Sequence, residues 1–557
     1  MAMSTLWKRL GRPGYGIVHD IRNRLPYLKS DYTDAWNYRV VASTTFLLFA
    51  NILPELSFSL DQFVGTNNSY GLNEVLMSSA IGGCAFGLFS GQPLNVVGVT
   101  GPVSVISTTI YDLVHPMGTP FLQFMCWVYL WSALFHWIIA FFNGVKWLGI
   151  VTSYSCNSFG FFINFVYLTK AIQILSDQFH VSVASGFASV VVSLLMVFFG
   201  VGAHLFGSST HFLRPWMRKI FLDYGTPAAV VFFTGFVHFG GYLNNVKFQN
   251  LPTTTSFQPT DKVNRPHGWF IHFWEGVTVG DVFLAVPFAL LVTFLFYFDH
   301  NVSAIMSQPL KYPLKKPASF HWDFALLGIT TGVCGLIGIP ACNALVPQSP
   351  LHTESLAVYN DDGEIVDVVE QRVSNTAQGA ITFFLMSGPM LVVLGLVPQA
   401  VLAGLFFVMG IIGIHESIVT DKIRYIFTQK QFKARDFPMI DHAVSQLSDY
   451  RWFLLYVVLE ALMGLAEYAI TVTPGAIGFP LVLLVSLVLA RWVWPRIFNP
   501  SDLAVLDGPV CDPAIMRALK LKQESDESES DMELVSAESA PSVEGLKHRK
   551  REVETKV

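Results

Sequence analysis

Two short segments of the sequence have the composition expected of a binding site for an oxygen-rich solute. They span 91–102 (GQPLNVVGVTGP) and 338–353 (GIPACNALVPQSPLHT). In each one, an extended stretch that contains proline leads to a residue favoured at the first turn of a helix, Gly101-Pro102 in the first segment and Pro350 in the second. The unpaired N–H groups at such a helix start, together with the helix dipole, attract anions. Two starts that face each other would form one site of positive potential without a lysine or arginine side chain.

The side chains of these segments indicate what the site would bind. Amide and hydroxyl groups would donate hydrogen bonds to the solute, as would the N–H groups of the helix starts. The residues predicted to bind it are Gln92, Asn95, Thr100, Gly101, Asp299, Gln348, Ser349 and Pro350. The six cysteines show no C-x-x-C or Cys/His spacing typical of metal ligands, so we predict no metal and no cofactor.

Two carboxylates could couple the solute to a second ion. Asp299 ends a largely apolar run, 290–298, and an ionisable group at membrane depth is costly enough to indicate a function. A carboxylate beside an anion repels it unless the carboxylate takes up a proton or a cation. Asp299, and Glu55 after Pro54, are therefore the predicted coupling residues. The alternative places Asp299 at the wet cytosolic end of its helix.

The composition indicates whether the helices that carry these residues are surrounded by water or by lipid. Hydrophobic residues make up 52% of the 557 residues and charged residues 13%, against about 25% charged in an ordinary soluble domain. Mean hydropathy is +0.47. Charged residues gather in 1–35 and 500–557, and the long body between them cannot cover itself with polar groups. A polytopic membrane protein is predicted, which excludes a soluble enzyme, a nucleic-acid binder and a secreted scaffold.

Fourteen apolar runs, in two sets of seven, can be identified along this body. They lie at 37–59, 75–91, 95–110, 121–143, 149–175, 184–206, 225–240, 280–300, 322–337, 343–357, 379–397, 399–415, 450–468 and 478–494. The third and tenth runs hold the two segments described above. Because seven is odd, the second set enters the membrane from the opposite side, and paired interrupted helices in such an inverted repeat indicate a transporter site at the midplane. The alternative is a packed bundle with two kinked helices.

The predicted organisation has five parts. They are a cytosolic N-terminal segment 1–36, a first seven-helix repeat 37–240, an extracellular loop 241–279, a second repeat 280–495 and an acidic, disordered cytosolic tail 496–557. Lysine and arginine gather in alternate loops, which places both termini in the cytosol. In the tail, serines interleave with acidic residues over 524–533, a composition typical of disorder and compatible with phosphorylation.

Several motifs, in a fixed order, resemble those of one known family. The strings are Phe49-Ala50 with Pro54 and Phe58, Gly91-Gln92-Pro93, Val97 to Pro102, Asp299, His321-Trp322-Asp323, Glu370-Gln371-Arg372-Val373 and Pro398 to Gly410. They resemble the bicarbonate and anion-exchanger family, and within it the boron (borate) efflux transporters of fungi and plants. Where bicarbonate exchangers carry an arginine in the tenth helix, this chain has Gln348. A guanidinium suits a permanent anion, whereas a neutral amide suits a polyhydroxyl solute whose charge changes.

The resemblance implies a core domain of helices 1–4 and 8–11, a gate domain of helices 5–7 and 12–14, and a homodimer formed through the gate domains in the lipid bilayer. It implies secondary active export of borate or boric acid across the plasma membrane by rocking of core against gate. An internal membrane such as the vacuole, and coupling to protons, are left open. Borate would lie between the two helix starts and accept hydrogen bonds from Asn95, Thr100, Gln348 and Ser349.

Three alternatives remain. The nearest is a bicarbonate or chloride exchanger, against which Gln348 argues. Another is the same architecture carrying nucleobases or sulfate. The third is a membrane scaffold or receptor that works through its acidic tail, and deletion of 500–557 would distinguish it, because a transporter should keep its flux. An enzyme is not predicted, since the sequence offers no nucleophile–base pair or metal-ligand set.

Overall fold

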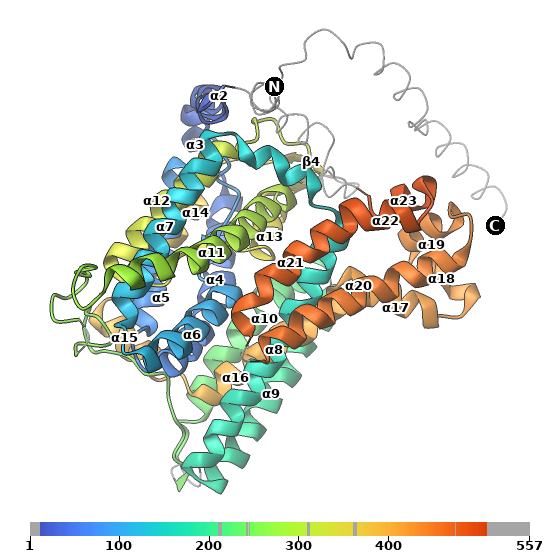
Figure 1. Cartoon of the computed structure of the whole chain (residues 1–557). Coiled ribbons are helices and arrows are strands. Elements are labelled where there is room, and N and C mark those ends of the chain that lie inside the picture. Colours follow the sequence, from blue (N-terminus) through green and yellow to red (C-terminus); the bar gives the residue numbers. More distant parts are fainter. Residues whose placement is uncertain are drawn as a thin grey trace.

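The computed structural model describes residues 12–508, except 210–213, 241–242, 244, 264, 309–311, 360–364 and 474, and nearly all of its regular structure is helical (Figure 1). Within these residues, nine spans are long and apolar enough to cross a membrane. They are α4 (Tyr38–Gly65), α5 (Leu72–Phe89), α7 (Phe121–Phe141), α8 (Ser153–Val181), α9 (Val183–Ser208), α11 (Val279–Met306), α16 (Gln399–Glu416), α20 (Tyr450–Thr471) and Ala476–Ile497, which contains α21 (Phe479–Val488) and α22 (Trp494–Ile497). A pair bent by 87°, α14 (Val373–Leu385) and α15 (Gly388–Leu394), forms a tenth.

Ten further α-helices and two strand pairs complete the fold within the described residues. Four helices lie among the spans, namely α6 (Gly101–Val114), α10 (Pro215–Phe236), α12 (His321–Ile337) and α13 (Gln348–Ser355). Six more are peripheral, namely α2 (Tyr15–Arg24), α3 (Leu28–Thr33), α17 (Ile418–Phe427), α18 (Lys430–Asp436), α19 (Pro438–Ser445) and α23 (Pro500–Leu506). The strands form two antiparallel pairs, β1 (Val97–Gly98) with β2 (Asn343–Ala344) and β3 (Ala357–Tyr359) with β4 (Ile365–Val368).

The predicted all-α integral membrane class, with short extended stretches in two interrupted helices, is confirmed. Each of the fourteen predicted runs overlaps at least one helix. The nine or ten helices that meet the length and hydropathy requirements of a span do not by themselves establish fourteen crossings. The fourteen-span inverted repeat therefore stays a prediction.

Close helix packing is made possible by small residues. α5 lies against α14, and a Cβ added at Gly83 of α5 would lie 3.0 Å from the Cα of Gly379 of α14. α8, α9, α10 and α16 form a second group, in which α16 packs on both α8 and α9 (Figure 1). In lipid, where apolar surface is not driven together by water, such small-residue contacts let backbones approach closely and gain van der Waals energy.

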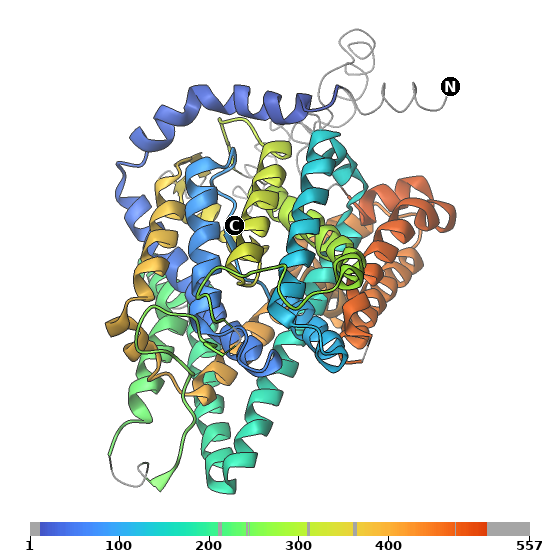
Figure 2. The same ribbon diagram turned by 60° about the vertical axis from the view of Figure 1, so that its left-hand side comes forward.

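The N-terminal helices α2 and α3 lie across the ends of the bundle helices (Figure 2). Asp20 of α2 accepts hydrogen bonds at 2.7 to 3.1 Å from the N–H groups of Phe320, His321 and Trp322. Those N–H groups have no partner within α12, because they belong to its start, and the negative charge of Asp20 also complements the helix dipole. The predicted N-terminal segment 1–36 is thus folded from α2 onward, and residues 1–11 lie outside the described part.

A buried ionic cluster ties α3 to the bundle. The Asp31 carboxylate, which is 0% exposed, pairs with Arg24 at 2.9 Å, Lys316 at 2.8 Å and Arg372 at 2.7 Å. Burial acts to raise the pKa of this carboxyl, but the three cations outweigh it and hold the pKa below the usual 3.8. The cluster therefore stabilises the fold above about pH 4 and loses that contribution as the pH falls through the lowered pKa.

The predicted tail 496–557 begins with folded residues. In α23, the Asp502 carboxylate accepts a hydrogen bond from the N–H of Ser448 at 2.9 Å. Through this contact α23 lies against the start of α20. The rest of the tail, including the acidic stretch 524–533 predicted to be disordered, lies outside the described residues.

Candidate functional site

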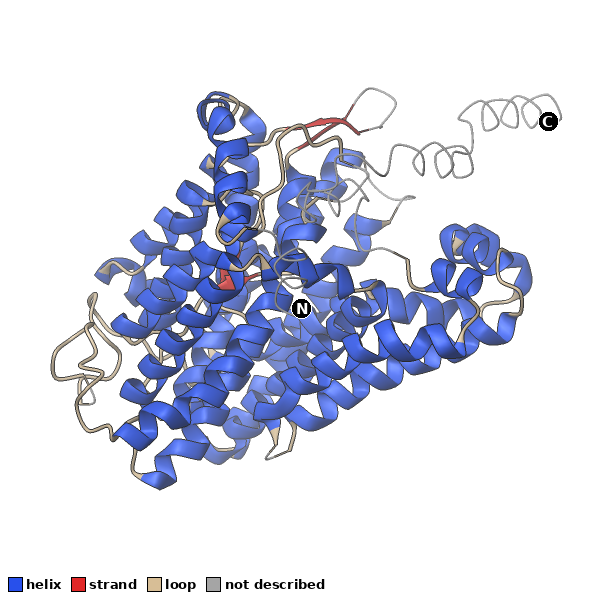
Figure 3. Ribbon diagram, turned by 45° about the horizontal axis from the view of Figure 1, so that its top comes forward, coloured by secondary structure: helices blue, strands red, loops and turns tan. Residues whose placement is uncertain are grey.

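A strand pair among the helices joins the two interrupted segments (Figure 3). β1 and β2 run antiparallel, with Val97 opposite Ala344 and Gly98 opposite Asn343. α6 begins just after β1, and α13 begins at Gln348 just after β2. Both helix starts therefore lie beside the strand pair, which is the arrangement that the two proline-containing segments predicted.

A hydrogen-bonded cluster fastens the start of α13 to the first segment. Ser349 Oγ lies 2.9 Å from Asn95 Oδ1 and accepts the N–H of Val96 at 2.9 Å. Ser303 Oγ, from α11, lies 2.8 Å from the same Asn95 oxygen and 2.7 Å from Ser349 Oγ. Two predicted residues, Asn95 and Ser349, are thus in direct contact. Ser303 was missed, because one serine in an apolar helix has no spacing signal.

The start of α6 faces aromatic rings. A Cβ added at Gly101 would lie 3.4 Å from ring carbons of both Phe58 and Tyr167. Those two rings and the ring of Phe406 in α16 contact one another, with centroids 5.6 to 6.1 Å apart, and we call these three residues the aromatic cluster. The hydroxyl of Thr100 is buried at this helix start and has no hydrogen-bond partner among the described residues.

Each strand has one buried carboxylate beside it. Asp299 in α11 is 2% exposed and accepts a hydrogen bond from Asn343 Nδ2 of β2 at 3.2 Å. Glu55 in α4 lies against β1, since a Cβ on Gly98 would be 3.1 Å from Glu55 Oε1. The alternative of a wet helix end for Asp299 is therefore wrong, because the side chain is buried within α11. The glycine at 98 leaves room for the second carboxylate.

The side chain of Gln348 is held by a backbone carbonyl of α4 that has no partner within the helix. Pro54 lies inside α4 and has no N–H, so the carbonyl of Ala50, four residues earlier, lacks its usual partner in the helix. Gln348 Nε2 donates to that carbonyl at 3.4 Å. Its Oε1 atom is buried and accepts no hydrogen bond from any residue that the structure describes. A neutral amide therefore fills the position between α4 and the start of α13.

Gln92 is oriented by other contacts. Its N–H donates to Asp323 Oδ2 at 3.0 Å, and its side-chain oxygen accepts the N–H of Leu94 at 3.4 Å. Asp323 also accepts the N–H of Gly91 at 2.6 Å. These contacts fasten the turn before β1 to α12, so direct binding of a solute by Gln92 stays a prediction. Pro350 lies in the first turn of α13, as predicted.

Two arginines hold the carbonyl ends of the helices that precede the strands. Arg372 donates to the carbonyl of Leu88 at the end of α5 at 2.8 Å. Arg265 donates to the carbonyl of Ile337 at 3.1 Å and to that of Gly338, at the end of α12. A guanidinium in this position satisfies carbonyls that have no helical partner and complements the helix dipole. α5 and α12 correspond to the second and ninth predicted runs, so the two arginines occupy equivalent places in the predicted repeat.

Two cavities are lined in part by α4. The large cavity, about 580 Å³, is lined by Phe46 of α4, Leu351 of α13 and charged side chains of α9, α10 and α16. It begins about one helical turn from the contact of Gln348 with α4. The small cavity, about 240 Å³, is lined by Asp61 of α4 and Lys170 of α8, which pair at 2.6 Å. The aromatic cluster lies about one turn from Asp61 and Lys170, between the start of α6 and the small cavity.

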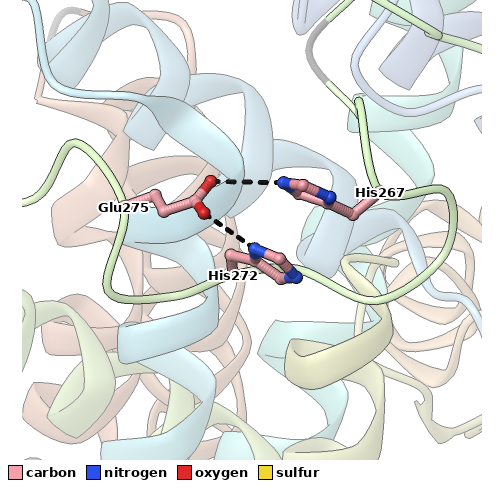
Figure 4. Close-up of side chains that lie close together, drawn as sticks. All are labelled: His267, His272 and Glu275. Atoms are coloured by element: carbon pink, nitrogen blue, oxygen red, sulfur yellow. Dashed lines mark hydrogen bonds and ion pairs between the residues drawn. The ribbon is translucent and has the colours of Figure 1, made fainter.

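A second polar cluster, missed in the sequence, lies in the loop between α10 and α11 (Figure 4). It consists of His267, His272 and Glu275, whose spacing is H-x4-H-x2-E. The hydrogen bond from His272 lowers the pKa of the Glu275 carboxyl below its usual value. The spacing matches no helical or strand period, so the sequence alone could not bring these side chains together.

A family model described as the HCO3- transporter integral membrane domain matches residues 12–193 and 179–510. The chain is 46% identical over 521 residues to a Saccharomyces cerevisiae protein named Boron transporter 1, covering 92% of this chain and 89% of that protein. It is 44% identical to a Schizosaccharomyces pombe protein named as a putative transporter, covering 89% of this chain and 96% of the relative. It is 27% identical to the Band 3 anion transport protein of Rattus norvegicus, covering 90% of this chain and 56% of that protein.

Proposed function

This chain belongs to the HCO3- transporter integral membrane domain family, and from that premise we propose that it carries borate or boric acid across a membrane by secondary active transport. The observation that carries the choice of solute is the neutral amide of Gln348 at the start of α13, in a chain so similar to a yeast relative named for boron. A guanidinium would favour a permanent anion, whereas an amide donates to a neutral hydroxyl solute and to its anion alike.

The solute lies beside the β1–β2 pair, between the starts of α6 and α13. Boric acid, neutral at cytosolic pH, becomes the tetrahedral borate anion by adding hydroxide, and the N–H groups at the two helix starts stabilise that charge. Thr100 supports this placement, because its hydroxyl is buried at the helix start without a partner in the described residues. Asn95, Gln348 and Ser349 supply further polar contacts.

Asp299 and Glu55 balance the charge of the site. Each lies next to one strand, so an anion bound at the strand pair is repelled while they are ionised. Uptake of a proton by one of the acids removes its share of the repulsion. Proton coupling through these two carboxylates follows as part of the proposal.

The two cavities are the access paths. The large cavity connects the start of α13 to one side of the membrane, and the aromatic cluster separates the start of α6 from the small cavity. In the proposed cycle, a core of α4–α7 and α11–α15 moves against a gate of α8–α10, α16 and α20–α22, and the site becomes open to the small cavity. The protein acts as a homodimer in the plasma membrane, exports boron from the cell and keeps both termini in the cytosol.

The test is the boron content of cells that lack their own exporter, grown in high external boric acid with and without this protein. Lower boron in cells that contain the protein is the expected result. Unchanged boron, with the protein detected in the membrane, would overturn the proposal.

The second candidate is bicarbonate or chloride exchange, which is supported by the match to the HCO3- transporter family model and by the similarity to an anion transport protein, Band 3. Gln348→Arg distinguishes the two, because it places a fixed positive charge at the start of α13. For a borate transporter we expect export to fall about tenfold or more. Bicarbonate exchange by the unmodified protein, with no boron flux, would establish the second candidate.

A further inference from the structure

The loop between α10 and α11 brings two imidazoles and one carboxylate together (Figure 4). His272 Nδ1 lies 2.8 Å from Glu275 Oε1, and His267 Nε2 lies 3.5 Å from Glu275 Oε2. One potential ligand atom from each of the three side chains lies within 4.8 Å of the other two. The two imidazole rings stack with their centroids 3.6 Å apart. Three atoms of the types that bind transition metals therefore surround one small volume.

The backbone that carries these side chains is anchored just before the cluster and at two positions within it. Arg265, just before the cluster, is 4% exposed and donates to carbonyls at the end of α12. Within the loop, the N–H of Ile271 donates to the carbonyl of Leu336 at 2.8 Å. The carbonyl of Phe273 accepts the indole N–H of Trp127, in α7, at 2.8 Å. Because the loop is already ordered by these contacts, little conformational entropy is lost when a ligand binds to it.

We propose that His267, His272 and Glu275 bind one Zn²⁺ ion. Zn²⁺ takes imidazole nitrogen and carboxylate oxygen in four-coordinate sites, and three protein ligands leave the fourth position to water. Bonds of about 2.0–2.2 Å place tetrahedral ligand atoms about 3.3–3.6 Å apart, so small rotations of these partly exposed side chains close the set around the ion. Ca²⁺ and Mg²⁺ need mainly oxygen ligands and do not fit. The site does not depend on the proposed borate transport.

Bound Zn²⁺ reinforces the contact of the loop with the end of α12. That end turns at Gly338, whose φ of +71° suits glycine, and then leads into β2. One ion would link the two ends of the short stretch 267–275, so this stretch would unfold locally less often than it does without the ion. The expected consequence is a higher unfolding temperature in the presence of the ion, as for any ligand that binds the folded state.

The experiment uses the full-length protein, purified in detergent without a histidine tag and titrated with Zn²⁺ by calorimetry. We expect one Zn²⁺ per chain, and an affinity at least about tenfold weaker in His272→Ala and in Glu275→Ala. His180→Ala, which removes an exposed histidine at the end of α8, is the matched control and should bind as the unmodified protein does. Unfolding temperature is measured in parallel with Zn²⁺, Mg²⁺ or no added ion.

The outcomes separate the site from adventitious binding. A Zn²⁺-dependent rise in unfolding temperature that disappears in both loop variants, but not in His180→Ala, supports the proposal. Equal affinity in all variants, or no binding by the unmodified protein, overturns it. An equal rise with Mg²⁺ overturns the assignment to Zn²⁺. Correct folding of each variant is checked by its elution profile and by its unfolding temperature without metal.

Discussion

The β1–α6 and β2–α13 segments approach the site in the same way. Each follows a helix whose carbonyl end is held by an arginine, and each of those arginines has an acidic partner. Arg372 pairs with Asp31 at 2.7 Å, whereas Arg265 lies 3.8 Å from Glu74. In the predicted topology, the ends of α5 and α12 lie on opposite sides of the membrane. The same kind of contact, an arginine on helix-end carbonyls, therefore holds the helix before each strand.

The two segments differ after the strands. α13 begins in a cluster of hydrogen bonds in which Ser349 contacts Asn95 and Ser303. α6 begins against the rings of Phe58 and Tyr167. Hydrogen bonds in a buried place are directional and costly to leave unmade, whereas ring contacts can be repacked with little loss. The start of α13 is thus bounded by directional hydrogen bonds, whereas the start of α6 is bounded by apolar ring contacts.

The largest expected effect is on stability and compares the two arginines. Arg372→Ala removes a 2.7 Å buried ion pair, although Asp31 keeps Arg24 and Lys316, and it also removes the donor to the carbonyl at the end of α5, so we expect a loss of about 3–5 kcal/mol of stability and a low yield of folded protein. Arg265→Ala should cost about 1–3 kcal/mol, because Glu74 keeps hydrogen bonds from Gly71 and Thr260. Unfolding of the purified variants measures both losses. A larger loss in Arg265→Ala would contradict the comparison.

The next effect is on transport and compares the two acids. Asp299→Ala should abolish borate export without loss of protein from the membrane, because the charge beside β2 can no longer change. Asp299→Asn keeps the size of the side chain and should also lower export about tenfold or more. Glu55→Gln, the matched change beside β1, should have the smaller effect, because Asp299 is hydrogen-bonded to β2 whereas Glu55 only lies against β1. Cell boron and the amount of protein in the membrane are measured together, and normal export by Asp299→Ala would refute its role.

The smallest effect compares two hydroxyls at the helix starts. Ser349→Ala removes the hydroxyl that forms hydrogen bonds with the N–H of Val96 and the side chain of Asn95, at a cost of about 1–3 kcal/mol. Thr100→Ala removes a hydroxyl with no partner in the described part of the chain and should change stability by about 0.5 kcal/mol or less. Unfolding temperatures decide between them, and equal losses would mean that the two segments are fastened alike.

The class of the protein and the location of its interrupted helices could be predicted from the sequence. Composition identifies the solvent, since a chain with 13% charged residues cannot be covered by water-exposed polar groups. Proline and glycine act on their own backbone, so the helix starts at Gly101 and near Pro350 follow from local chemistry. Asp299 could be selected because an ionisable residue inside an apolar stretch is costly and therefore informative, whereas Gln348 was selected through the family resemblance.

The partners of those residues were decided by tertiary structure. Ser303 of α11 and Tyr167 of α8 meet the site from outside the two segments, and their types and spacing give no sign of it. Gln92 carries a matching motif, and its backbone N–H is held by Asp323 of α12. A buried polar group forms its hydrogen bond with whichever neighbouring element lies within reach. The pattern of residues along one helix does not reveal which helix will pack against it, so these partners could not be predicted from the sequence.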